Sequence, residues 1–367
     1  MSSAAAGRDA SVAEGLVVVD KPPGCTSHDV VAACRRIYRT RRVGHAGTLD
    51  PDATGVLCVG VGRVTRLLRF VGDGWKSYTA EVVFGTATDT MDDSGRPTGV
   101  WDMTDLAPEA VLAAAQALTG PIEQVPPMVS AVRVGGRRLH QLAREGVVVE
   151  RAARPVVVRS LRLRPSTGPL VWLMDVTCST GTFVRVLGHD LGAMLGGGAH
   201  IRKLRRTAVG PFGIAQAIPL QRLAASPQEA AAALLGPLEA VAGLPWVRVP
   251  DEMVTAVGNG AVFAPDVFSR FPVLSPDPIG HHVHGQDPGP LTAVGTSGAA
   301  GPIDTTVPEH CGGDDAGPGG RMEPIGRSPG GDTWAVVGPQ GKLLAVYGRS
   351  PRGVKPLVVM NGHTGSD

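Results

Sequence analysis

Strand-like and helix-like segments follow one another irregularly in the first two thirds of the chain, and this order limits the possible folds. Alternating or unbroken apolar residues predict strands, whereas apolar residues that recur on one helical face predict helices. The strands are expected at 15–24, 55–62, 76–85, 155–164 and 170–178, and the helices at 26–39, 63–71, 108–120 and 183–195. Because these segments do not alternate as βαβ units, the sequence predicts an α+β fold rather than a doubly wound parallel sheet.

A chain of 367 residues exceeds the usual size of one domain, so two domains are expected. A Pro- and Gly-bearing stretch at 241–250 places the boundary, which gives a larger domain at 14–244 and a smaller one at 245–367. In the smaller domain, apolar alternation around Gly-Pro-Gln-Gly predicts a β-hairpin at 333–350. The carboxyl-terminal domain is therefore expected to be rich in strands.

Two segments lack the apolar residues that a packed core needs. Residues 1–13 and about 275–332, which are dense in small and polar residues, are predicted to be disordered. The second segment holds His281, His282, His284, His310 and Cys311, but so loose a stretch does not predict a metal site. The five cysteines are scattered and show no C-x-x-C spacing, which favours reduced thiols.

The charge is divided unevenly along the chain. Up to residue 244 there are 27 Lys and Arg against 21 Asp and Glu, a net +6, whereas the remainder has 8 against 12, a net −4. Arginines gather at 34–42, 135–144 and 201–207, a pattern that favours nucleic-acid binding by the larger domain. No apolar run is long enough to cross a membrane and the first residues do not resemble a signal peptide, so a cytoplasmic protein is expected.

The loop GHAGTLDPDATG, residues 44–55, sets one carboxylate between small residues and a proline. Pro51 favours an extended conformation at Asp50, which would project its side chain. The spacing alone fits either an ordinary Asp-Pro turn or a catalytic carboxylate. Neither a phosphate-binding glycine motif nor a Ser/His/Asp, Cys/His or zinc-enzyme pattern accompanies it. If the chain is an enzyme, one carboxylate is expected to do most of the chemistry.

This loop and five further segments resemble, in the same order, the tRNA pseudouridine-55 synthase family, which modifies the uridine of the tRNA T-loop. The resemblance spans roughly residues 15–215. Its other segments are VVVDKPPGCTSHDVV, KSYTAEVVFGTATDTMDDSG, PPMVSAVRVGGRRLHQLAREG, CSTGTFVRVLGHDLG and AHIRKLRRTAVGPF. It implies the pseudouridine-synthase fold, a mixed, mostly antiparallel sheet flanked by helices, with a small β-rich, PUA-like module at the carboxyl end.

The resemblance also implies the reaction. Uridine's C1′–N1 bond is broken, the uracil turns, and it is rejoined through C5, with neither net redox change nor hydrolysis. No cofactor and no metal are therefore expected. The uridine must flip out of its loop, and a carboxylate can attack either C1′ of the ribose or C6 of the base.

The catalytic residues implied by the resemblance are Asp50, Tyr78 and Arg185. Asp50 matches the catalytic aspartate, Tyr78 the tyrosine that stacks on the flipped base, and Arg185 the arginine that pairs with the aspartate. Such a pair would lower the aspartate's pKa. Without the resemblance, Tyr78 would be read as a packing residue and Arg185 as a helix-surface arginine. The implied substrate-binding residues are Lys21, His45, Leu204, Arg137, Arg138, Arg144, Arg202 and Arg205.

The chain departs from the family pattern at three positions. Phe183 stands where the family usually has tyrosine, and Arg133 and His140 replace the commoner lysine and tyrosine. The expected partner is tRNA, through its T-loop and T-arm, with no DNA, no membrane and a monomeric protein. Two alternatives remain: a non-catalytic RNA-binding or tRNA-folding protein, and a synthase for a different RNA or uridine.

Overall fold

The computed structural model describes residues 13–274 and 332–360. The two segments predicted to be disordered lie outside these ranges except for their end residues. The histidines and the cysteine considered above as metal ligands also lie outside the described residues. Within the described part, no helix is long and apolar enough to cross a membrane.

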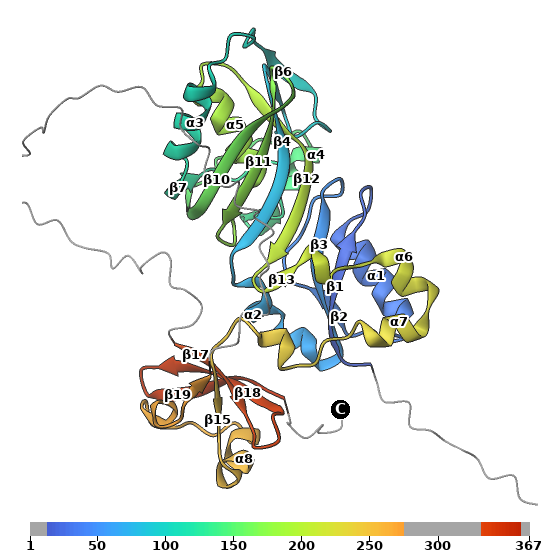
Figure 1. Cartoon of the computed structure of the whole chain (residues 1–367), viewed down its shortest axis with the longest axis vertical. Helices are drawn as coiled ribbons and strands as arrows, with labels where there is room; N and C mark the ends of the chain where they lie inside the picture. The colour runs from blue at the N-terminus through green and yellow to red at the C-terminus, as the bar shows by residue number, and fades with distance from the viewer. Residues whose placement is uncertain (1–12, 275–331, 361–367) are drawn as a thin grey trace, which may run out of the picture. The chain divides into compact units, whose positions relative to one another are not determined.

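A sheet of ten strands is built from residues 15–219 (Figure 1). Its strands are β1 (Gly15–Lys21), β2 (Val43–His45), β3 (Thr54–Val61), β4 (Lys76–Phe84), β7 (Gly120–Gln124), β10 (Arg154–Gly168), β11 (Val171–Cys178), β12 (Ala199–Val209), β13 (Phe212–Gly213) and β14 (Ile218–Pro219). The order is β14-β1-β3-β12-β4-β11-β10-β7, with β13 beside β12 and β2 beside β3. Only β1–β14 and β12–β3 are parallel pairs within the described sheet, so the prediction of a mixed, mostly antiparallel sheet is confirmed.

Helices pack on this sheet through the apolar faces that their sequences predict. The α3 and α5 helices bury their apolar residues against β4, β10 and β11, and α1, α6 and α7 bury theirs against β1 and β3. The helices are α1 (Ser27–Ile37), α2 (Leu68–Gly72), α3 (Pro108–Ala117), α4 (Leu139–Arg144), α5 (Val184–Met194), α6 (Leu220–Ala225) and α7 (Pro227–Ala232). Short pairs also form between β5 (Thr86–Thr88) and β6 (Pro97–Val100), and between β8 (Arg133–Val134) and β9 (Arg137–Arg138).

The first helix begins at Ser27, directly after its N-cap. Thr26, not Ser27, is the N-cap: its hydroxyl accepts a hydrogen bond from the Asp29 backbone N–H, and the Asp29 carboxylate accepts one from the Thr26 N–H. This reciprocal pair satisfies two backbone donors at the helix start. Ser27, the first residue of the helix, is buried, and its hydroxyl is free for another task.

A second, five-stranded sheet is built from the carboxyl-terminal part of the described chain. Its order is β16-β15-β17-β18-β19, and the predicted hairpin is confirmed as β17 and β18. The elements are β15 (Trp246–Arg248), α8 (Asp251–Gly258), β16 (Val273–Leu274), β17 (Thr333–Val337), β18 (Leu343–Ser350) and β19 (Gly353–Val359). The expected β-rich module is therefore present.

Candidate active site

The loop between β2 and β3 carries Asp50 and is fixed by side chains on both sides of it. The Leu49 N–H donates to the Ser27 hydroxyl at 2.9 Å, and that hydroxyl lies 3.2 Å from the Leu49 carbonyl. The Lys21 ammonium donates to the Pro51 carbonyl at 2.7 Å. Asp50 thus lies between two anchored residues, which restricts the directions in which its carboxylate can point.

Arg206 anchors the start of the same loop from β12. It is 1% exposed and donates to the carbonyls of Val56 at 2.7 Å, Gly47 at 3.1 Å and Thr48 at 3.4 Å. Gly47 has a φ of +89°, a conformation that strains any residue with a Cβ. The glycine therefore allows the turn that brings both carbonyls to the guanidinium.

Arg185 binds the Asp50 carboxylate at the start of α5. Its Nε lies 3.0 Å from Asp50 Oδ2, and a second carboxylate, Asp92, lies 3.4 Å from another guanidinium nitrogen. The guanidinium also donates to the carbonyls of Thr90 at 2.7 Å and Val129 at 2.8 Å. The Arg185 side chain is only 4% exposed, whereas 42% of the Asp50 side chain is open. The arginine is thus fixed by two further segments, while the carboxylate stays accessible.

The pKa of Asp50 is raised, not lowered, relative to an ordinary aspartate. Burial is the largest cause, because the protein walls displace the water that would solvate the charge. Arg185 acts in the opposite direction and Asp92 adds to the rise through repulsion. Arg185 does act to lower the pKa of Asp50, as predicted. The prediction of a lowered pKa was nevertheless wrong, because burial outweighs the arginine.

Gln124 at the end of β7 aligns the start of α5. Its side chain is 2% exposed; its carbonyl accepts from the Phe183 N–H at 2.9 Å, and its amide group donates to the Phe183 carbonyl at 3.3 Å. Phe183 is the N-cap position of α5 and makes no side-chain cap itself. The glutamine therefore positions the backbone two residues before Arg185.

Gln124→Ala is expected to lower kcat about 10-fold with little change in KM, because the arginine loses a support of its backbone. The loss of two buried hydrogen bonds also lowers the free energy of unfolding by roughly 1–3 kcal/mol. Steady-state kinetics and thermal melting check both effects. An unchanged kcat in a destabilised variant would restrict Gln124 to a structural role.

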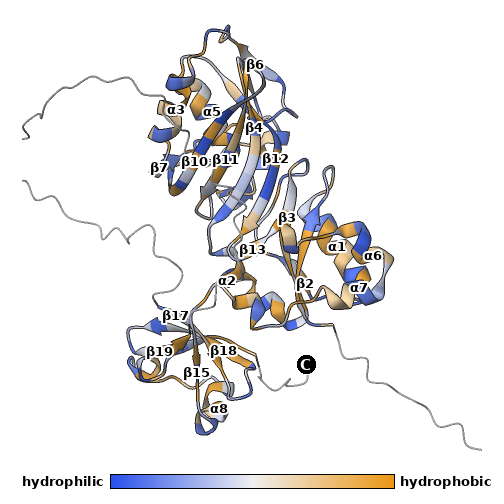
Figure 2. Ribbon diagram, in the orientation of Figure 1, coloured by the Kyte–Doolittle hydropathy of each residue, from blue (hydrophilic) through white to orange (hydrophobic). Residues whose placement is uncertain are grey.

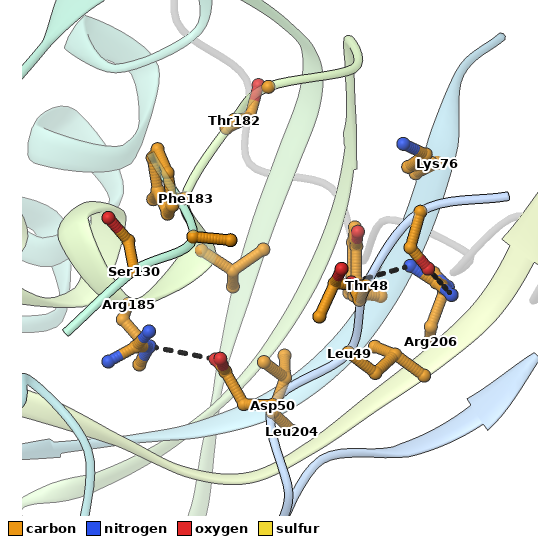
Figure 3. Close-up of a pocket in the computed structure, with 15 residues that line it drawn as sticks. Thr48, Leu49, Asp50, Lys76, Ser130, Thr182, Phe183, Arg185, Leu204 and Arg206 are labelled. Carbon is orange, nitrogen blue, oxygen red and sulfur yellow. Dashed lines mark hydrogen bonds and ion pairs between the residues drawn. The ribbon is translucent and has the colours of Figure 1, made fainter. Parts of the chain in front are cut away.

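A cavity of about 220 Å³ opens above Asp50 (Figure 3). Tyr78 from β4 and Leu204 from β12 line it together with Phe183 and Ser130. Burial raises the pKa of Tyr78, so its phenol is neutral at physiological pH. The Ser130 hydroxyl is buried and has no hydrogen-bond partner among the described residues. The cavity therefore combines an apolar and aromatic wall with unused polar groups.

A bulge in β12 aims Leu204 at the cavity. The pairing of β12 with β4 shifts between Arg202 and Arg205, and Lys203 at this place has a φ of +53°. Such an irregularity turns a side chain out of the regular alternation of a strand. Figure 2 shows hydrophilic residues gathered on β12, and the bulge explains why its alternation is hard to recognise in the sequence.

Several of the residues predicted to bind substrate lie outside the cavity. Arg202 pairs with Glu81 at 2.7 Å and Arg205 pairs with Asp20 at 2.8 Å. Lys21 is completely buried, and its ammonium also donates to the carbonyls of Pro22 and Cys25 at 2.9 Å and 2.6 Å. A direct contact of Lys21 with substrate is not favoured, since three carbonyls already take its hydrogens.

His45 ends β2 and stacks edge-on against His28, with ring centroids 5.5 Å apart. Its Nδ1 is buried with no partner in the described chain, and burial is the main cause that lowers the pKa of this imidazole. His45 is thus neutral at physiological pH. Farther along the chain, Arg137 pairs with Glu145 in the segment that contains α4.

Arg144 and Arg138, in the same segment, have no ion pair within residues 13–274 and 332–360, and Arg144 is exposed. His140 stabilises this segment, since both its Nδ1 and its backbone N–H lie about 3.0 and 3.1 Å from the Ser130 carbonyl. The histidine that departs from the family pattern therefore has a structural contact of its own. Among the described residues no group of three His, Cys, Asp or Glu side chains is placed to hold a metal ion.

Sequence reasoning missed four polar residues that shape the cavity: Arg206, Lys76, Asp92 and Gln124. Lys76 lies two positions before Tyr78 and so shares its face of β4, a signal that strand alternation alone could have given. Arg206 lies in the arginine cluster at 201–207, but no strand was predicted there. Asp92 and Gln124 come from distant segments and carry no local signal.

Comparisons with known proteins identify the family. The model of the TruB family pseudouridylate synthase N-terminal domain matches residues 35–184, and that of the tRNA pseudouridylate synthase B C-terminal domain matches 185–242. A protein called tRNA pseudouridine synthase B from Symbiobacterium thermophilum is 48% identical over 68% of this chain and 83% of its own length. One of that name from Mycolicibacterium paratuberculosis is 51% identical over 58% of this chain and 74% of its own.

A solved structure supports the fold independently. A chain in the crystal structure of a Cbf5–Nop10–Gar1 complex superposes with a TM-score of 0.63 at 24% identity, covering 95% of this chain and 85% of that one. A chain in the structure of an H/ACA ribonucleoprotein bound to a substrate RNA containing 2′-deoxyuridine gives 0.59 at 23% identity, covering 95% and 84%. At this level of identity the likeness concerns the fold alone, and the expected fold is confirmed.

Proposed function

The chain belongs to the TruB family of tRNA pseudouridine synthases, and from that premise we propose how its cavity performs the reaction. It is an isomerase that converts uridine in tRNA to pseudouridine. We propose Asp50 as the nucleophile, Arg185 as the group that holds it, and Tyr78 as the surface on which the flipped uracil stacks. The observation that carries this assignment is the 3.0 Å contact between a buried arginine and an accessible carboxylate at the floor of a cavity.

The reaction balances without any other reactant. The C1′–N1 bond breaks, a C1′–C5 bond forms, the proton on C5 leaves, and N1 takes up a proton. Attack by Asp50 at C1′ releases the uracil, and attack at C6 holds the base while the bond to the sugar breaks; both routes need an ionised carboxylate. Arg185 favours the ionised state and fixes the direction of attack, because its guanidinium is itself fixed by Thr90 and Val129.

Base flipping requires protein contacts that offset the lost stacking, a few kcal/mol. The aromatic face of Tyr78 and the apolar side chains of Leu204 and Phe183 fit a uracil between them. Arg138 and Arg144, which are not ion-paired within the described ranges, fit a role in binding backbone phosphate. We propose that the segment 126–155 closes over the RNA through these side chains.

The proposed target is the uridine at position 55 in the T-loop of tRNA. Unmodified tRNA incubated with the enzyme is expected to gain one pseudouridine at that position, and tRNA with cytidine there is expected to gain none. Mapping of pseudouridine along the whole tRNA checks this. Product at another uridine would favour the alternative of a synthase for a different site.

The organisation of the chain is proposed along the same lines. Residues 14–244 form the catalytic domain, and 245–367 form a small carboxyl-terminal domain that contains the segment 275–332. We also propose that the enzyme acts as a monomer in the cytoplasm, where its tRNA substrate is found. Size measurement of the purified protein in solution, with and without tRNA, tests the monomer.

A further inference from the structure

Lys76 is a buried lysine whose ammonium has no partner among the residues that the structure describes. It begins β4, lines the cavity and is 8% exposed, yet its ammonium makes no hydrogen bond and no ion pair in the part of the chain that the structure describes. Lys21, which is completely buried, instead donates to three carbonyls. A largely buried charge without a partner is unfavourable, because no group of the described chain replaces the water that it has lost. Something bound in the cavity would supply the missing partner.

The surroundings of Lys76 hold a second positive charge. A Cβ built on Gly47 would lie 3.2 Å from the Lys76 ammonium and 3.7 Å from the Arg206 guanidinium, so both cations border the same turn. Arg206 faces no carboxylate within ion-pair distance in the described chain. In Figure 3 these two side chains lie on one side of the hollow and Arg185 with Phe183 on the other.

Among the described residues, no counter-ion neutralises this side of the cavity. Lys76 is influenced by Arg206 on β12, the thiols of Cys178 on β11 and Cys58 on β3, and Asp73 in the turn before β4. Burial raises the pKa of Cys178 to about 11 and of Cys58 to about 12, so both thiols are neutral at pH 7. Burial and then Arg206 lower the pKa of Lys76 to about 8. Asp73 is exposed and screened by water.

We propose that Lys76 and Arg206 form an anion subsite that takes a phosphodiester group flanking the flipped uridine. This inference rests on the proposed function, because it assumes that the cavity accepts that nucleotide. The flanking phosphates are the only formal negative charges of the nucleotide, and an ammonium binds phosphate as a compact point charge. Three of the five N–H donors of Arg206 go to carbonyls that hold the loop, so its guanidinium is fixed and supplies mainly positive potential. Lys76, whose ammonium has no partner among the described residues, supplies the direct contact.

Lys76→Met is expected to stabilise the RNA-free protein while impairing its function. The folded-state pKa of Lys76, about 8, lies below that of an unfolded lysine, so the penalty for the charge is present below pH 8. It disappears as the pH rises towards about 10.4, the ordinary value. The melting temperature of the variant should thus exceed that of the wild type at pH 7, and the difference should vanish near pH 10. A purely structural lysine would give a lower melting temperature instead.

Phosphate recognition is tested with T-arm stem-loop RNAs that carry a neutral methylphosphonate on either side of the target uridine. Each modified RNA is compared with a control RNA that has only phosphate linkages and carries the same 2′-O-methyl groups. Affinity is measured in the Asp50→Asn background, with and without Lys76→Met, and kcat/KM is measured with Asp50 intact. One methylphosphonate and Lys76→Met should each weaken binding about 10-fold, and together no more than either alone. The salt slope of the affinity should fall by about one unit.

Lys76→Arg, which keeps the charge, should retain most of the binding, and Lys342→Met provides the same substitution at an exposed turn. If the loss of affinity from Lys76→Met adds to the loss from each of the two methylphosphonates, the proposal is overturned. If Lys76→Met no longer weakens the affinity when the target uridine is replaced by thiouridine, Lys76 binds a uracil carbonyl, and the proposal is also overturned. If the wild type forms no pseudouridine in the T-loop, the proposed function fails first; if it does and the losses are additive, only this inference fails.

Discussion

Asp50→Asn is expected to lower the single-turnover rate of pseudouridine formation by roughly 10⁴- to 10⁶-fold, the range of losses when a member of a catalytic group with a covalent nucleophile is removed. The amide has the shape of the carboxylate but cannot attack carbon, and it leaves Arg185 without its charged partner at 3.0 Å. The affinity for tRNA should change only a few-fold, since the cavity walls and the basic segment remain. Rates of product formation and equilibrium binding, measured on the same tRNA, separate the two effects.

Asp52→Asn is the matched control, because it makes the same change two residues away in the same loop, on an exposed side chain. It should retain most of the activity. Equal product from Asp50→Asn and the wild type would remove Asp50 from the chemistry. Tight tRNA binding without product from the wild type would instead favour the non-catalytic RNA-binding alternative.

Local sequence patterns were enough to predict the parts of the fold that depend on neighbours in the chain. The segment 76–85, for example, was predicted to be a strand, and β4 forms there with Tyr78, Ala80 and Val82 on its buried face. Hairpin signals predicted β17 and β18 in the same way. The strand β12 escaped prediction, because its bulge at Lys203 and its run of basic residues interrupt the alternation. A buried central strand with such a composition is stabilised by tertiary contacts that the local pattern does not show.

The candidate site shows the same division. Asp50, Tyr78 and Arg185 were identified through the family resemblance, and the structure brings Asp50 and Arg185 into contact. Their electrostatics could not be predicted, because the pKa of Asp50 depends on how much water the folded walls exclude and on a second carboxylate, Asp92. Nor could the sequence reveal that Ser27 anchors the catalytic loop rather than a helix end.

The site is held by cations that bind backbone carbonyls. Lys21 binds the loop just after Asp50, Arg206 binds it just before, and Arg185 binds two further segments that border the cavity. Each buried charge is solvated by carbonyl dipoles in place of water, which limits the penalty of burial. The loop is thereby ordered before substrate arrives, and little of the binding free energy is needed to place the nucleophile. Lys76 differs from the other three because its ammonium binds no carbonyl among the described residues.

Arg185→Met and Asp92→Asn are expected to shift the pH dependence of kcat/KM in opposite directions. In the proposed mechanism the enzyme needs ionised Asp50, so activity is expected to fall as the pH drops through the pKa of this carboxyl in the free enzyme. Arg185 lowers that pKa and Asp92 raises it. Arg185→Met therefore moves the acid limb to higher pH and, by loosening the nucleophile, lowers the rate at pH 7 by about 10²–10³-fold. Asp92→Asn moves the limb to lower pH.

Asp92→Asn is a mild change for the fold, since its remaining oxygen can still accept from the Thr90 and Ser94 hydroxyls, which bind Asp92 Oδ1 at 2.6 Å each. Arg185→Lys keeps the positive charge and should leave the acid limb closer to that of the wild type than Arg185→Met does. Shifts of the same sign in Arg185→Met and Asp92→Asn would mean that a group other than Asp50 controls the acid limb. Opposite shifts would assign the acid limb to Asp50, the carboxylate that both residues influence. Removing a positive and a negative charge has opposite electrostatic effects on its pKa, whereas a general loosening of the site by either substitution would shift the limb in the same direction.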